Sequence, residues 1–153
     1  MKESILALLI GIGGTNSLGE KSPYYLGGLR IETQDFRIEG VYDSSDKIES
    51  PGYRISGSAI WKFHRARFGT SYSYRHTEAW NKDAVFLVIG AGSDKVELLF
   101  LPAINSSNNE LKLELRIRLW KLELHSLYEY YNMTNGRTDK RFGICSQLIV
   151  VLP

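Results

Sequence analysis

Histidine and serine are the residues of this chain best suited to nucleophilic catalysis. His125 and Ser126 are consecutive, and catalysis of this kind requires a histidine that can take the hydroxyl proton. Consecutive residues of a β-strand point to opposite faces, so a regular strand prevents a direct hydrogen bond between these side chains. His76 has no serine near it on the same face, and His64 lies among lysine and arginine residues that disfavour a general base. The sequence therefore predicts no catalytic residue.

Residues for metal, cofactor or nucleic-acid binding do not cluster either. Three separated histidines and the single cysteine, Cys145, do not have the spacing of metal ligands. The glycine-rich run 11–14 is not followed by the Lys-Ser/Thr of a phosphate loop. The 19 Lys and Arg residues are interleaved with 17 Asp and Glu residues, giving a net charge of +2 and no basic stripe. We expect no metal, no cofactor and no nucleic-acid partner.

Polar and apolar residues alternate along much of the chain. The clearest segment is 111–119, where leucine and isoleucine alternate with Lys, Glu and Arg. A period of two predicts a strand with one apolar and one polar face. The alternation changes phase at Trp120-Lys121, which indicates a tight turn there. A hairpin around this turn pairs Leu119 with Leu122 and Arg118 with Glu123, so both faces match in one register.

The same matching predicts three more hairpins. Their turns are expected at Gln34-Asp35, Arg65-Ala66 and Ser93-Asp94. The corresponding pairs are Arg30 with Glu39, Phe63 with Phe68, and Ile89 with Leu98. Longer polar connections are predicted between the hairpins, at 44–52, 77–83, 103–109 and 133–139. Short turns and long loops thus alternate along an antiparallel chain.

The N-terminal apolar run, Ile5 to Ile12, decides the number of strands. It follows Lys2 and precedes Ser17-Leu18-Gly19, so residues 1–19 resemble a signal peptide cleaved after Gly19. The alternative is a first strand. The four hairpins and a strand at 141–152 make nine, so a first strand gives ten, while one long bent strand at 24–43 gives eight. We predict an all-β, antiparallel up-and-down meander that closes into a barrel of 8–10 strands, with residues 20–153 as a single domain.

This pattern resembles the small bacterial outer-membrane barrels of the OmpA and OmpX type, although no family-specific motif accompanies it. The resemblance implies a bacterial outer-membrane location, membrane lipid around the apolar face, and an aromatic girdle at each interface. The girdle residues would be Phe36, Tyr42, Trp61, Phe63, Phe68, Tyr72, Tyr74, Tyr128 and Tyr130. The alternative is a soluble, lipocalin-like barrel with the apolar face inside around a hydrophobic ligand.

In the membrane barrel, the charged face would line the lumen. The expected lumen charge network comprises Arg30, Glu32, Arg37, Glu39, Lys112, Glu114, Arg116, Arg118, Glu123, His125 and Glu129. Side chains of this size leave little free bore in a barrel of eight to ten strands, so we expect a largely plugged lumen rather than an open porin. A structural or surface-interaction role would then lie in the loops, through Trp80, Ile48 and 105–109. A lipid A-modifying enzyme is the alternative that barrels of this kind also allow.

Overall fold

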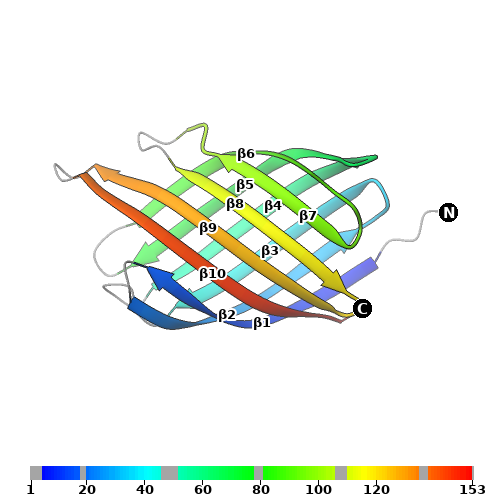
Figure 1. Cartoon of the computed structure of the whole chain (residues 1–153), viewed down its shortest axis with the longest axis horizontal. Coiled ribbons are helices and arrows are strands. Elements are labelled where there is room, and N and C mark those ends of the chain that lie inside the picture. The colour runs from blue at the N-terminus through cyan, green and yellow to red at the C-terminus, as the bar shows by residue number, and fades with distance from the viewer. Residues whose placement is uncertain are drawn as a thin grey trace.

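A computed structural model describes residues 5–17, 20–45, 52–77, 81–105, 110–134 and 138–152, and the side chains of 5–14, 23, 25–44, 53–76, 81–105 and 110–130. The described chain is all-β and antiparallel, and its strands form a closed barrel (Figure 1). The strands are β1 (Ile5–Ser17), β2 (Glu20–Glu32), β3 (Phe36–Ser45), β4 (Gly52–Phe63), β5 (Ala66–Thr77), β6 (Asn81–Gly92), β7 (Val96–Pro102), β8 (Leu111–Leu119), β9 (Leu122–Thr134) and β10 (Thr138–Leu152). The predicted up-and-down barrel is confirmed.

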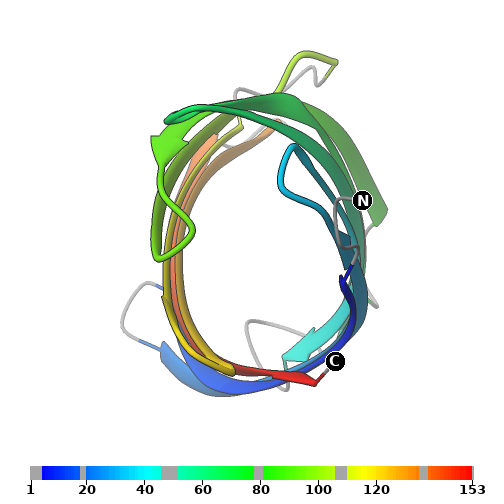
Figure 2. The same cartoon turned by 90° about the vertical axis from the view of Figure 1, so that its right-hand side faces the viewer.

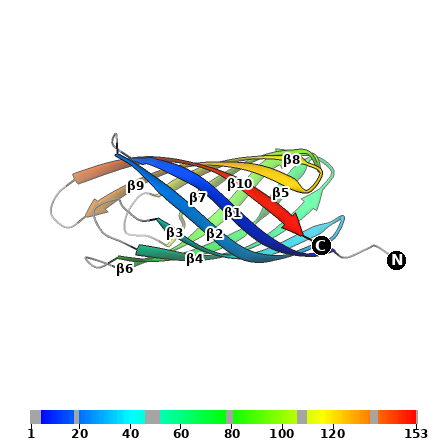
Figure 3. The same cartoon turned by 90° about the horizontal axis from the view of Figure 1, so that it is seen from below.

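The N-terminal apolar run forms the strand that closes the barrel. β1 pairs with β2 along its whole length and with β10 from Leu8 opposite Leu152 to Ser17 opposite Gly143. Viewed along its axis, the barrel has an oval section (Figure 2), and β1 lies beside β10 when the barrel is seen from below (Figure 3). The described strands therefore form the ten-strand alternative. Cleavage after Gly19 stays the alternative prediction, and it would remove β1.

The two ends of the barrel differ in their connections. The end that holds Ile5 and Leu152, which we call the turn end, carries the connections 33–35, 64–65, 93–95 and 120–121. The opposite loop end includes the connections 46–51 and 103–110. The predicted loops at 77–83 and 133–139 are wrong in length, because β5 and β6 leave only 78–80 between them, and β9 and β10 leave only 135–137. Polar residues there continue the strands, because a polar interior accepts side chains such as Lys82.

Two of the four predicted hairpin registers are confirmed. Arg30 lies opposite Glu39 between β2 and β3, and Arg118 lies opposite Glu123 between β8 and β9. The other two are wrong by two residues, because Phe68 lies opposite Trp61 and Ile89 lies opposite Phe100. A shift of two residues keeps every side chain on its own face, so the alternation alone cannot exclude it.

Two of the hairpin turns contain a residue in the left-handed backbone conformation. His64 has a φ of 52° and Trp120 has a φ of 58°, and each is the first residue of a two-residue connection. A positive φ at the first central residue is a feature of type II′ hairpin turns, where glycine is usual. Because His64 occupies this position in place of glycine, the sequence contains no local signal that the turn is at His64-Arg65.

The two faces of the sheet differ sharply in composition. On β8, Leu113 and Leu115 are on the outside with exposed fractions of 40% and 38%, whereas Arg116 is 6% exposed in the interior. The same division continues around the described barrel, where large apolar residues are outside and most buried ionisable residues are inside. No helix in the described part of the chain is long and apolar enough to span a membrane.

Candidate functional site: the charged barrel interior

The barrel interior contains ion pairs that cross from one wall to the other. Glu39 on β3 accepts hydrogen bonds from Arg30 on β2 (2.8 Å, from Nε) and from Arg116 on β8 (3.1 Å, from Nη1). β3 and β8 are five strands apart in both directions around the barrel. The bond between Arg116 and Glu39 therefore joins opposite walls.

A second carboxylate, Glu123 on β9, lies beside this pair and is 1% exposed. Arg30 donates to both of its oxygens, at 2.8 Å and 2.9 Å, in the two-pronged geometry that favours arginine over lysine. Arg118 donates to the same carboxylate at 3.2 Å. Arg30 thus connects Glu39 with Glu123, and the three arginines and two glutamates form one continuous network.

The network continues to the turn end of the barrel. Glu97 on β7 accepts hydrogen bonds from Arg37 at 2.6 Å and from Arg67 at 2.7 Å. Glu32 accepts from Lys62 at 2.5 Å and from Arg118 at 2.9 Å. Each of these carboxylates is shared by two cations from different strands, which ties the strands together across the bore.

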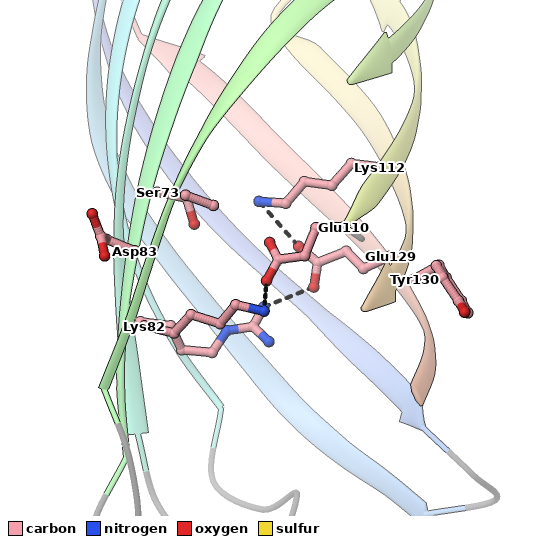
Figure 4. Close-up of a pocket in the computed structure, with 9 residues that line it drawn as sticks. Ser73, Lys82, Asp83, Glu110, Lys112, Glu129 and Tyr130 are labelled. Atoms are coloured by element: carbon pink, nitrogen blue, oxygen red, sulfur yellow. Dashed lines mark hydrogen bonds and ion pairs between the residues drawn. The ribbon is translucent and has the colours of Figure 1, made fainter. Parts of the chain in front are cut away.

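At the loop end, Glu129 on β9 is the shared acid. It pairs with Arg54 and with Arg75 (2.7 Å), and it lies 3.5 Å from Lys112. Figure 4 shows Lys112, Glu129, Glu110 and Lys82 around a cavity of about 360 Å³ that opens to solvent, and Lys82 pairs with Glu110. Paired ions therefore extend along the interior from the turn end to the loop end.

Each of the eleven residues predicted for the lumen has a partner in the interior, an ion pair for ten of them and a hydrogen-bond contact with Glu114 for His125. The residues are Arg30, Glu32, Arg37, Glu39, Lys112, Glu114, Arg116, Arg118, Glu123, His125 and Glu129. The interior also contains ionisable residues outside that predicted network: Asp43, Arg54, Lys62, Arg67, Arg75, Lys82, Glu97 and Glu110. Each has the same parity as its strand's other interior residues, so alternation along every strand places all of them on this face.

One interior wall is apolar, which the sequence analysis did not predict. Its residues are Ile60, Ala84, Phe86, Val88, Leu99 and Leu101, all at most 3% exposed. β6 and β7 contain the nearly continuous apolar segments 84–89 and 98–101, and such runs are typical of strands that are apolar on both faces. Lys112 reaches from the charged region to this wall, with its Nζ 4.2 Å from the Phe86 ring centroid.

The predicted girdle residues lie on the outside near the two ends. At the turn end, Trp61, Phe63 and Phe68 are 48%, 64% and 48% exposed, and Phe36 packs 5.3 Å from Trp61 between ring centroids. Towards the loop end the predicted residues are Tyr42, Tyr72, Tyr74, Tyr128 and Tyr130, of which Tyr42 and Tyr72 are exposed and the others half-buried. Tyr53, which was not among the predicted residues, stacks on Tyr42 with the two ring centroids 5.8 Å apart.

The histidines are held by neighbours of different kinds. His125 is buried with its Nε2 3.3 Å from Glu114. The Nδ1 of His76 lies 2.5 Å from the side-chain oxygen of Asn81. His64 stacks on Phe63 with the two ring centroids 4.7 Å apart. Among the described residues, no three His, Cys, Asp or Glu side chains are grouped as a metal site requires.

The loop residues singled out from the sequence are only partly described. Trp80, Ile48 and residues 106–109 lie outside the described residues. Asn105 accepts a hydrogen bond from the Val85 backbone N–H at 2.6 Å, and Ile104 is 62% exposed. The described start of the 103–110 connection is therefore anchored to β6 and presents an apolar side chain to the exterior.

No protein-family model matches the chain, and no curated protein matches it. Among solved structures, the chain is similar to the crystal structure of neisserial surface protein A, NspA, with 12% sequence identity and a TM-score of 0.45 over 97% of this chain and 99% of that one.

Proposed function

We propose that this chain is a bacterial outer-membrane β-barrel with a charged, largely plugged lumen and a structural or surface-interaction role. The observation that carries the proposal is the apolar outer surface. Side chains such as Ile10, Leu29, Ile55, Ile89 and Leu115 are 38–59% exposed around the barrel wall. Soluble monomers rarely expose contiguous apolar patches larger than a few hundred square ångströms, whereas an outer-membrane barrel requires an apolar band.

The length of the strands agrees with this proposal. A tilted strand needs about 9–11 residues to cross the hydrocarbon core, and most described strands have 9 to 15 residues. Tyr42 and Tyr53 near one end and Phe36 and Trp61 near the other would lie at the two membrane interfaces.

The soluble alternative fits the interior poorly. A lipocalin-like barrel needs an apolar cavity for its ligand, but opposite walls of this interior are joined by Arg116 and Glu39. In that alternative the outward Leu113 and Leu115 would also face water. The burial of paired charges and the exposure of leucines both favour lipid outside.

The plugged lumen is supported by the large side chains that meet inside. Arg30 and Arg37 are each 1% exposed, and Arg116 is 6% exposed, so these three large side chains occupy the bore in its turn half. We expect the purified barrel to conduct ions poorly in a planar bilayer. Replacing both members of the cross-wall pair, Arg116→Ala with Glu39→Ala, should raise the single-channel conductance. Equal conductance of both proteins at an open-pore level would show that the lumen is not plugged.

Thiol labelling in intact membranes tests the outward face. Leu115→Cys and Arg116→Cys are made separately in a Cys145→Ser background. We expect Cys at 115 to react only with a lipid-phase reagent, because this side chain would face acyl chains. Free labelling at 116 by a water-soluble reagent, with 115 inert to both reagents, would contradict the membrane proposal.

The surface-interaction role would belong to the loop end. The two longest connections there are 46–51 and 103–110, and Ile104 is 62% exposed beside the second one. Protease treatment of intact cells should cleave in these connections and leave the turn-end connections uncut. Cleavage at 64–65 or 120–121 instead would place the turn end outside the cell and contradict a surface role for the loop end.

A further inference from the structure

Arg37 on β3 is a buried cation with few partners. It is 1% exposed, and only its Nη1 donates a hydrogen bond, to Glu97 at 2.6 Å. Its Nε and Nη2 have no hydrogen-bond partner. A buried N–H group without an acceptor costs free energy, and more when it is charged. Arg37 therefore requires an acceptor that the neighbouring side chains do not supply.

The surrounding carboxylates are already engaged. Both oxygens of Glu97 accept from arginines, one from Arg37 and the other from Arg67. Glu123 accepts from Arg30 and Arg118, and Glu32 accepts from Lys62 and Arg118, as described above. None of these acids can turn towards Arg37 without releasing another cation.

The interior ions of the turn half do not balance. In the described part of the chain, six cations share five carboxylates there: Arg30, Arg37, Lys62, Arg67, Arg116 and Arg118 against Glu32, Glu39, Glu97, Glu114 and Glu123. The closing strands add no acid, because 5–17 and 143–152 contain no Asp, Glu, Lys or Arg. One positive charge is left over, and Arg37 is the cation that has unbonded nitrogens.

Arg37 also lines a cavity at the turn end. Its lining consists of four basic and four acidic residues: Arg37, Lys95, Arg116, Arg118, Glu32, Asp94, Glu97 and Glu123. Lys95 and Asp94 are exposed in the turn between β6 and β7, so this cavity lies where the interior meets solvent. Its space of about 230 Å³ includes the open mouth, and the enclosed part is close to the size of one water molecule, so only an ion of about that size would fit.

From this geometry we propose that the turn end of the barrel binds a small monovalent inorganic anion, of which chloride is the type, against the guanidinium of Arg37. The anion supplies the acceptor that the buried guanidinium lacks and neutralises the extra charge of the turn half. Lys95 at the mouth of the cavity attracts the anion to the site. The proposal depends only on the interior ions and is independent of what surrounds the barrel.

Halide titration of the purified full-length chain tests this site. The protein is brought into sodium gluconate in a nonionic detergent, and chloride or bromide replaces gluconate at constant ionic strength. A ligand that binds only the folded state stabilises it with increasing concentration. We expect the unfolding temperature to rise by a few degrees and to level off as the site saturates. No halide dependence would overturn the proposal, because water would then satisfy Arg37.

Two variants make the test specific. Arg37→Gln should abolish the halide-dependent rise, whereas Arg75→Gln, which changes an interior arginine at the loop end, should retain it. An equal rise in both variants would overturn the site. A second measurement needs no variant: the chlorine-35 resonance should broaden with the wild-type protein and sharpen again when bromide is added. Absence of this broadening would overturn the proposal even if Arg37→Gln fails to fold.

Discussion

Arg116 and Glu39 lie on opposite walls of the barrel, and the Arg116 Nη1 donates to the Glu39 carboxylate at 3.1 Å. Glu39 also accepts from Arg30 at 2.8 Å, so one carboxylate holds two buried guanidinium groups. This contact joins β3 to β8, which no backbone hydrogen bond connects. The barrel is therefore braced across its bore as well as around its circumference.

Loss of the Glu39 charge should be strongly destabilising. Glu39→Gln leaves Arg30 and Arg116 buried with less compensation, and breaking one side of a buried pair costs about 3–5 kcal/mol. Urea unfolding of the barrel reconstituted in lipid vesicles measures this change. Asp94→Asn is the matched control, because Asp94 is exposed in a turn, and we expect a change within about 0.5 kcal/mol. Similar effects for both variants would show that the cross-wall pair does not brace the fold.

A charge placed on the outer face should lower the free energy of unfolding, and the loss should increase with the depth of the charge in the membrane. Leu115 is at the middle of β8 and Leu119 is at its turn-end terminus. In the proposed orientation, Leu115→Arg should cost about 2–4 kcal/mol at the midplane, and Leu119→Arg about 0–1 kcal/mol at the interface. Unfolding in lipid vesicles gives both values. If the two substitutions cost the same, β8 does not cross the membrane as proposed.

The barrel wall depends on a close approach at Gly69. A Cβ at this residue would lie 2.0 Å from the Ala59 carbonyl oxygen, whereas a Cβ at Gly40 would meet nothing within 4 Å. Gly69→Ala must displace the backbone of β4 or β5, and overpacking of this kind costs about 1–3 kcal/mol. Gly40→Ala is the control and should be nearly neutral. Equal unfolding free energies for the two variants would contradict the close approach.

The closing strand should be part of the mature protein. β1 pairs with β2 and β10, so cleavage after Gly19 would expose two unpaired edges, which natural sheets avoid. We expect N-terminal sequencing and intact mass of the membrane-isolated protein to show that residues 5–17 are retained. A mature chain beginning at Glu20 would establish the signal peptide and require β2 and β10 to meet without β1.

Much of the fold follows from the sequence because side chains alternate with a period of two. The segment 111–119 and its continuation after Trp120 contain both the strand faces and the turn, and the pairs Arg118 with Glu123 and Leu119 with Leu122 are correct. The same alternation placed Arg30 and Glu39 on one face of their hairpin. The resemblance to outer-membrane barrels added the expectation that this face is the inner one.

Only the tertiary structure decided which charges meet across the bore and how far the strands of two hairpins are shifted. Trp61, rather than Phe63, lies opposite Phe68. The sequence does not reveal this register, because a two-residue shift leaves both faces unchanged and the left-handed turn residue is His64 rather than a glycine. Contacts across the bore, such as Arg116 with Glu39, depend on the closure of ten strands into an oval barrel. Local alternation carries no information about that closure, because it records the face on which a side chain lies and not the distance to the opposite wall.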